Sequence, residues 1–265
     1  MTPLSDLHIH SIYSDGNLTP SELAKTFAKR NASVIALTDH DTVTGVKEMS
    51  EACKEFGMIN IPGVEISTYH DLEIHILGYN MDMTNNSFVQ FMDALSKKRN
   101  ERVQMILHKL KLHGINISYE QVLKCSTASV SRFHIARVMA NSKYGDGTVH
   151  GCYKRYLDYG KPCYVPHFVS EPENAIKIIK KAGGIAVLAH PMRLELKRQD
   201  IENLIKRLAN NGLDGIEAEY RDNKDFVKFA EDNNLLITAG GDFHSDNSVP
   251  YLRPMRMNLR KALNV

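Results

Sequence analysis

The feature that most constrains this chain is a polar residue at or near the end of nearly every short apolar run. Seven runs are rich in apolar and β-branched residues and are typical of buried strands; they span 4–10, 33–38, 59–67, 72–79, 184–190, 212–220 and 235–241. Each run carries a histidine, an aspartate or a glutamate close to its C-terminal end. Such groups are costly to bury without partners, so the fold must bring these ends together.

Helical segments separate several of these runs. Residues 19–30 begin with Thr19, Pro20 and Glu22, the pattern of a capping box, and further amphipathic segments cover 171–184, 201–212 and 225–234. Repeated β–α units predict a parallel sheet, either open or closed into a barrel. In a barrel the C-terminal ends of the strands form one face, where active sites lie.

The alternation stops between residues 82 and 166. A long amphipathic helix is predicted over 86–114, and shorter helices over 118–124, 131–142 and 148–159. We therefore predict two domains: an α/β barrel formed by residues 1–81 and 167–265, and a helical insertion over 82–166 that serves as a substrate-binding cap.

Composition limits the partners and the location of the chain. Its 265 residues carry a formal net charge of only +2, so long duplex nucleic acid is not an expected ligand, although a local basic pocket is compatible with it. The four cysteines form no C-x-x-C pair, the N-terminus has no signal-peptide pattern, and no apolar run reaches the length of a membrane span. These features predict a cytoplasmic protein without a membrane partner.

The polar residues at the strand ends have the chemistry of metal ligands. His8 and His10 stand on the same side of the first strand, since side chains alternate along it. Imidazole and carboxylate together suit Zn²⁺, Mn²⁺ and Fe²⁺, and paired ions stabilise a phosphoryl or acyl transition state. A single histidine is more often structural, and Asp15 suits a loop turn. The recurrence at one end of nearly every strand favours a metal site.

Six motifs resemble those of the polymerase and histidinol phosphatase (PHP) domain family: DLHIHSIYSDG, ALTDHDT, PGVEIS, IHILGY, AVLAHP and GGDFHS. VSRFHIAR and YGKPCYVP are similar to its bacterial metal-dependent nucleotide phosphoesterase branch. The resemblance implies a distorted seven-stranded (β/α)7 TIM-like barrel with a helical insertion domain and a trinuclear metal centre. It implies two or three divalent ions (Mn, Fe or Zn), a metal-bound hydroxide as the nucleophile, and no protein nucleophile.

The resemblance also assigns ligands residue by residue. His8, His10, Glu65 and Asp242 would hold the first ion. Glu65 would bridge to a second ion held with His75 and His190. A third ion would take Asp15, His40 and His244. Glu217 and Glu219 are interpreted as supporting residues rather than ligands.

The inserted segment is expected to hold the substrate phosphate. Helix N-termini and arginine favour anions, and the candidates are Ser131, Arg132, His134, Arg137 and Lys161. Phe133 stands where the branch usually has proline, a change that can alter the helix entry or add a stacking surface. The charged run 97–102 is interpreted as a solvated helix face, with an orientation of Arg99 and Arg102 toward the substrate as the alternative.

The predicted function is a metal-dependent phosphoesterase acting on a small phosphorylated substrate. The resemblance suggests removal of the 3′-phosphate from nucleoside 3′,5′-bisphosphates, and 5′-to-3′ hydrolysis of short oligonucleotides. Alternatives in the family are cyclic ribose phosphate and histidinol phosphate as substrates. A more remote alternative is an amidohydrolase, which would need a bridging lysine that no predicted strand end offers. A non-catalytic nucleotide or metal sensor is a further class.

Overall fold

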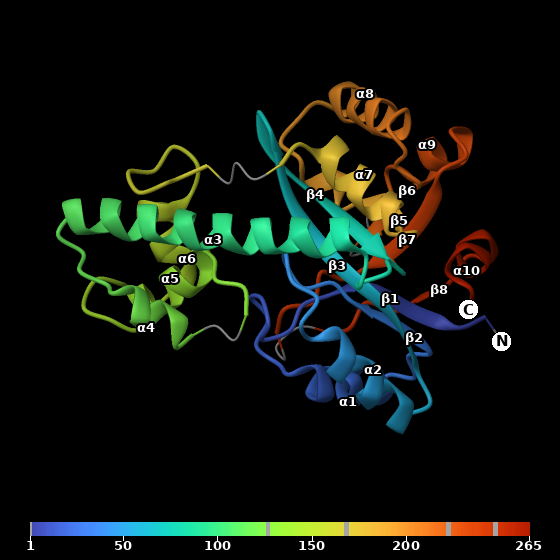
Figure 1. Cartoon of the computed structure of the whole chain (residues 1–265), viewed down its shortest axis with the longest axis horizontal. Helices are drawn as coiled ribbons and strands as arrows, with labels where there is room; N and C mark the ends of the chain where they lie inside the picture. The colour runs from blue at the N-terminus through green and yellow to red at the C-terminus, as the bar shows by residue number, and fades with distance from the viewer. Residues whose placement is uncertain (1, 126–127, 167–169, 221–223, 246–248) are drawn as a thin grey trace.

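A single sheet organises the chain. The computed structural model describes residues 2–125, 128–166, 170–220, 224–245 and 249–265. The strand order is β7-β6-β5-β4-β3-β2-β1-β8 (Figure 1). The strands are β1 (Leu4–Ile9), β2 (Val34–Leu37), β3 (Ile59–His70), β4 (Leu72–Tyr79), β5 (Ile185–Leu188), β6 (Gly215–Tyr220), β7 (Leu236–Gly240) and β8 (Arg253–Pro254).

The sheet is nearly closed into a barrel. β1 lies beside β7, and the seam is made at the end of β1 and just beyond β7, where Ile9 and Phe243 form a parallel bridge. The His10 amide donates to the Phe243 carbonyl at 2.8 Å, and the Phe243 amide donates to the His8 carbonyl at 3.1 Å. The predicted barrel had seven strands. The sheet has in addition the two-residue strand β8, which pairs antiparallel with the outer edge of β1.

The fourth strand runs against the predicted direction. β4 pairs antiparallel with both β3 and β5, whereas the sequence pattern favoured parallel strands throughout. Only Asp71 separates β3 from β4, and its φ of 61° closes a tight hairpin. A parallel partner would need a crossover of a dozen or more residues. His75 therefore reaches the barrel mouth from the first half of its strand, and not from the C-terminal end.

Helices cover the outside of the barrel (Figure 1). α1 (Pro20–Ala28) and α2 (Val46–Glu55) pack together on one side, and the predicted capping box of Thr19 and Glu22 is present. α7 (Pro172–Lys181), α8 (Arg198–Ala209) and α9 (Val227–Asp232) cover β3 to β7. α10 (Met257–Leu263) packs with alternate strand residues including Leu7, Leu77 and Val187. α2 and α10 were not predicted; neither has a side-chain cap.

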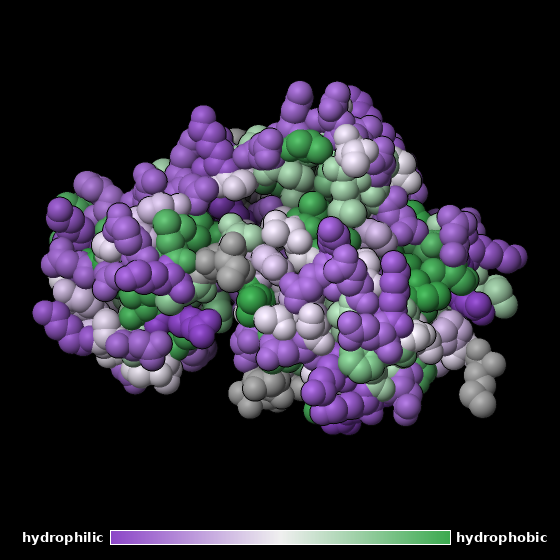
Figure 2. Space-filling view, turned by 60° about the horizontal axis from the view of Figure 1, so that its bottom comes forward, coloured by the Kyte–Doolittle hydropathy of each residue, from purple (hydrophilic) through white to green (hydrophobic). Residues whose placement is uncertain are grey.

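The segment between β4 and β5 is helical, as predicted. It contains α3 (Asn86–Leu112), α4 (Tyr119–Leu123), α5 (Arg132–Ala140) and α6 (Val149–Cys152), followed by a π-helical turn, Tyr153–Leu157. The start of α3 packs on the barrel through Phe88, whereas its later turns share a separate apolar cluster with α4 and α5. Figure 2 shows the two parts as lobes with a largely hydrophilic surface. The proposed boundary at 166–167 adjoins residues 167–169, which lie outside the described residues.

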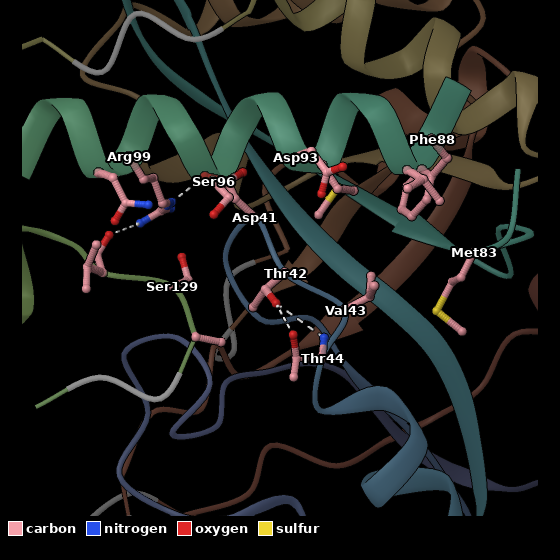
Figure 3. Close-up of a pocket in the computed structure, with 15 residues that line it drawn as sticks. Asp41, Thr42, Val43, Thr44, Met83, Phe88, Asp93, Ser96, Arg99 and Ser129 are labelled. Atoms are coloured by element: carbon pink, nitrogen blue, oxygen red, sulfur yellow. Dashed lines mark hydrogen bonds and ion pairs between the residues drawn. The ribbon is translucent and has the colours of Figure 1, made fainter. Parts of the chain in front are cut away.

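Two arginines of α3 correct the prediction of a solvated face. The side chains of Arg99 and Arg102 are buried, with 6% and 8% exposure. Arg99 Nε donates to Asp41 Oδ2 at 2.6 Å (Figure 3). Its Nη2 donates to Ser67 Oγ at 2.9 Å. Arg102 Nε donates to the Val165 carbonyl at 3.0 Å. Arg99 thus joins α3 to the barrel, next to the loop that carries His40. Arg102 joins α3 to the end of the helical segment.

No helix in the described part of the chain is both long enough and apolar enough to cross a bilayer.

Breaking the Arg99–Asp41 pair is expected to destabilise the fold strongly. Arg99→Met leaves the buried Asp41 carboxylate without its cation, a change that typically costs about 3–5 kcal/mol. The matched control, Lys98→Met, removes an exposed pair with Glu101 and is expected to cost less than about 1 kcal/mol. Urea unfolding of the metal-free proteins measures both changes. Equal small losses of unfolding free energy in the two variants would show that the Arg99–Asp41 pair does not stabilise the fold.

Candidate metal centre

Two histidines of the first strand point to the same buried carboxylates. His8 is the last but one residue of β1 and His10 directly follows the strand, and both are fully buried. His8 Nε2 lies 3.3 Å from Glu65 Oε1 and 3.5 Å from Asp242 Oδ1. His10 Nε2 lies 3.3 Å from Glu65 Oε2 and 3.2 Å from the same Asp242 oxygen. The four residues form the first of three groups whose ligand atoms are close enough to hold one ion.

Glu65 lies at the centre of the site. Its side chain is 1% exposed, and its Oε1 is 3.0 Å from His75 Nδ1 and 3.1 Å from His190 Nε2. Its other oxygen is 3.0 Å from His40 Nδ1. His40, Glu65 and His75 form the second group. His190 belongs to none of the three groups, although it contacts Glu65.

Asp15 gathers the third group. Its carboxylate lies 3.2 Å from His244 Nε2, 3.6 Å from His10 Nδ1 and 3.7 Å from His40 Nε2. His10 joins this group as well as the first, and His40 joins it as well as the second. All nine residues assigned through the family resemblance therefore lie around one mouth of the barrel. The sharing of His10 and His40 between groups was not foreseen.

Unusual backbone conformations place several of these residues. Asp41, His190 and Asp242 have φ values of 51°, 27° and 49°, in the left-handed region that side-chain-bearing residues seldom adopt. Each immediately follows, or lies within a few residues of, a strand end. Gly240 is required for a different reason: a Cβ there would collide with His8 and Glu217. Strained backbone of this kind clusters at functional sites.

Carboxylates behind the site orient the imidazoles. Glu217 Oε1 lies 3.0 Å from His8 Nδ1, and its Oε2 accepts the His190 amide at 2.8 Å, as a supporting residue should. Asp39 accepts hydrogen bonds from the Ser11 amide and the Ser14 hydroxyl, at 2.7 and 2.6 Å, and so shapes the loop that carries Asp15. Glu219 points elsewhere and pairs with Arg256 at 2.8 Å.

The charges of the site depend on one another. Burial opposes ionisation of Glu65, but the surrounding imidazoles hold the pKa of its carboxyl well below the usual range. Burial also opposes protonation of His10, yet Asp242 and Glu65 raise the pKa of that imidazole to about 10. His40 differs, because burial lowers its pKa to about 3. Without a bound cation, protons on the histidines balance the carboxylates.

Ligand atoms without a hydrogen bond show that these residues fit metal ions. Nε2 of His8, Nε2 of His10, Nδ1 of His40 and Oε2 of Glu65 are buried and lie close to one another, but among the described residues none of them has a partner in hydrogen-bond geometry. Buried polar atoms without partners are costly and rare in folded proteins. Here these atoms converge on one another, and each is an imidazole nitrogen or a carboxylate oxygen that can coordinate a divalent cation.

The site opens into a cavity of about 440 Å³ with two arginines at its edge. Arg132, from α5, was predicted; its Nη2 donates to Glu73 Oε2 at 3.0 Å. Arg193, in the 3₁₀ turn Pro191–Arg193, was missed, and only its position two residues after the AHP motif could have indicated it. Arg193 Nη1 donates to Asp242 Oδ2 at 2.6 Å.

The other predicted phosphate-binding residues differ in position. Ser131 and His134 form a capping box at the start of α5, and burial lowers the pKa of His134 to about 4 while its ring lies against the Ser14 backbone. Arg137 and Lys161 are exposed, and neither is among the described residues that line the cavity. For these two residues a substrate role stays a prediction.

The chain belongs to the PHP domain family, whose model matches residues 6–246. It is 36% identical over 252 residues to a 5′-3′ exoribonuclease of Haemophilus influenzae, covering 92% of this chain and 91% of that protein. It is 34% identical over 251 residues to the 3′,5′-nucleoside bisphosphate phosphatase of Chromobacterium violaceum, covering 91% and 87%. The predicted class, a phosphoric ester hydrolase, agrees with these relatives.

Solved structures share the whole fold. One, described as an amidohydrolase from Chromobacterium violaceum with bound sulfate and no metal, has a TM-score of 0.88 and 31% identity, covering 98% of this chain and 95% of that one. Another, provisionally described as a metal-dependent phosphoesterase from Bifidobacterium adolescentis, has a TM-score of 0.86 and 25% identity, covering 98% and 94%. No lysine is among the described residues lining the cavity here, in contrast to the requirement of the amidohydrolase alternative.

Metal binding is expected to stabilise the protein, and Glu65→Gln to abolish most of the effect. A ligand that binds only the folded state at about a hundredfold excess over its Kd adds about 2.7 kcal/mol. Glu65 contacts five imidazoles of the site and belongs to two of the three groups, so its loss weakens both groups at once. Thermal unfolding with and without Mn²⁺, together with metal content after dialysis, measures the change.

Glu55→Gln, at the exposed end of α2, is the control and is expected to keep the full metal content and the full stabilisation. Retention of both by Glu65→Gln would show that the metal lies elsewhere.

Proposed function

We propose that this protein is a metal-dependent phosphoesterase that removes the 3′-phosphate from nucleoside 3′,5′-bisphosphates and hydrolyses short 5′-phosphorylated oligonucleotides in the 5′-to-3′ direction. The observation that carries the proposal is the shared cavity: the carboxylate and imidazole groups line its floor, and Arg132 and Arg193 line its edge. A substrate with two phosphates could place one at the carboxylate and imidazole groups and the other at the arginines. Of the two relatives, one is a 3′,5′-nucleoside bisphosphate phosphatase, whose substrate carries two phosphates, and the other is a 5′-3′ exoribonuclease.

The nine residues at the barrel mouth would hold two or three divalent ions, with Mn²⁺, Fe²⁺ and Zn²⁺ as the candidates. When bound, such ions polarise a water for attack on phosphorus and neutralise the phosphate oxygens. The ligand set favours three ions, because it forms three groups. His10 and His40 each belong to two groups, so they would fix the spacing between neighbouring ions.

The protein's own residues position the metal ligands and the substrate. Glu217 holds His8 and the His190 backbone in place, and Asp39 holds the loop of Asp15. The Arg132 guanidinium has five N–H donors, of which the contact with Glu73 engages one nitrogen, so others are available to a phosphate. The helical segment serves as the cap that carries Arg132 over the mouth.

The first expected result is phosphate release from adenosine 3′,5′-bisphosphate by Mn²⁺-loaded protein, with 5′-AMP as the product. Asp242→Asn should lower kcat by at least about 100-fold, since losing even a residue that supports a metal ligand costs about 10–100-fold. Asp232→Asn, on the exposed surface of α9, is the control. No release by protein whose metals are shown to be bound would refute the nucleotide substrate.

The second phosphate gives a separate expectation. Arg132→Gln should raise KM for adenosine 3′,5′-bisphosphate about tenfold or more, because a hydrogen bond to a charged group contributes about 1.5–3 kcal/mol. KM for adenosine 3′-monophosphate should not change, since that substrate has no second phosphate. Arg198→Gln, exposed on α8, is the control. An equal rise in KM for both substrates would place Arg132 at the scissile phosphate instead.

A further inference from the structure

The metal cavity continues outward into a second cavity. The outer cavity has a volume of about 690 Å³ and shares Glu73, Arg132, Arg193 and Leu194 with the metal cavity. The two arginines therefore stand between the two spaces. A molecule whose phosphates lie on the metal ligands and the arginines has room to extend past them.

One wall of the outer cavity is aromatic. Tyr159 follows the π-helical turn and is 81% exposed. Its ring meets that of Tyr164 edge-on, with centroids 5.5 Å apart and an interplanar angle of 75°. The Arg132 guanidinium lies over the Tyr164 ring at 5.7 Å from its centroid. Exposed aromatic side chains beside a cationic group are the usual platform for stacking a nucleobase.

The charge of the outer cavity selects what can lie there. Asp71, Asp158 and Glu195 line it in addition to Glu73. Four carboxylates against two arginines disfavour a phosphodiester chain, whose phosphates would be repelled. They suit the ribose hydroxyls and the amino groups of a base, which donate hydrogen bonds to carboxylates.

We infer that the outer cavity is a nucleoside subsite in which Tyr159 and Tyr164 stack the base of the 5′-terminal nucleotide. The inference rests on the proposed function, because that reaction puts phosphates at the metal ligands and the arginines. It adds that the nucleotide bearing the 5′-phosphate is recognised through its base and ribose. A further phosphate on the 5′ side would meet the carboxylates, so the subsite fits a chain end.

Equilibrium binding tests the subsite without turnover. The probes are 5′-AMP, which has a base, and ribose 5-phosphate, which lacks it, and calorimetry measures both affinities for the Mn²⁺-loaded protein. Wild type should bind 5′-AMP about tenfold more tightly than ribose 5-phosphate. Tyr159→Ala should abolish that difference by weakening 5′-AMP alone, and Tyr159→Phe should preserve it, since the stacking face remains.

Phe56→Ala removes an exposed aromatic side chain at the end of α2 and is the control. Equal affinities of wild type for the two probes, or an equal loss for both in Tyr159→Ala, would overturn the subsite. Neither result depends on phosphate release from the bisphosphate. The proposed phosphoesterase activity can therefore hold even if the nucleoside subsite is refuted. Absence of the reaction would be detected separately from absence of base recognition.

Discussion

The Glu65 carboxylate is the interaction on which the site depends. It is a buried anion in contact with His8, His10, His40, His75 and His190, which come from four different parts of the chain. An isolated carboxylate at this depth would be neutralised by a proton, but the imidazoles keep its pKa low. The same carboxylate therefore requires cations around it, whether they are protons on histidine or metal ions. Its position on β3 fixes where the neighbouring strands must end.

Closure of the barrel makes this convergence possible. The backbone hydrogen bonds between His8, His10 and Phe243 join the first and last long strands, so the ligands of β1 and Asp242 meet although they are far apart in sequence. Arg99 extends the arrangement to the helical segment by bonding Asp41, whose own carboxylate accepts the Ser67 amide at 2.8 Å. The residue next to His40 is thereby held by α3. The position of the helical segment and the position of a candidate ligand are therefore coupled.

The sequence pattern indicated which polar residues gather at the barrel mouth, because each predicted strand carries or precedes one of them. Their assignment as metal ligands came from the family resemblance and stays a prediction. The direction of β4 was missed because it depends on the length of a hairpin, and the apolar run 72–79 looks the same in either direction. The burial of Arg99 was missed because its partner, Asp41, is distant in sequence. Arg193 has no pattern of its own; only the three-dimensional closeness to Asp242 reveals it.

The distribution of charge around the mouth favours a small substrate end over a long chain. Arg132 and Arg193 are the cations of the edge, and both already have carboxylate partners, Glu73 and Asp242. A phosphate reaching either arginine must share the guanidinium with that partner, so a dianionic, well-placed group is favoured over a passing phosphodiester. Beyond the arginines the lining is acidic and aromatic. Under the proposed function, a terminal 5′-phosphate would bind the arginines and its nucleoside would contact the outer lining, whereas an internal stretch of nucleic acid would match neither.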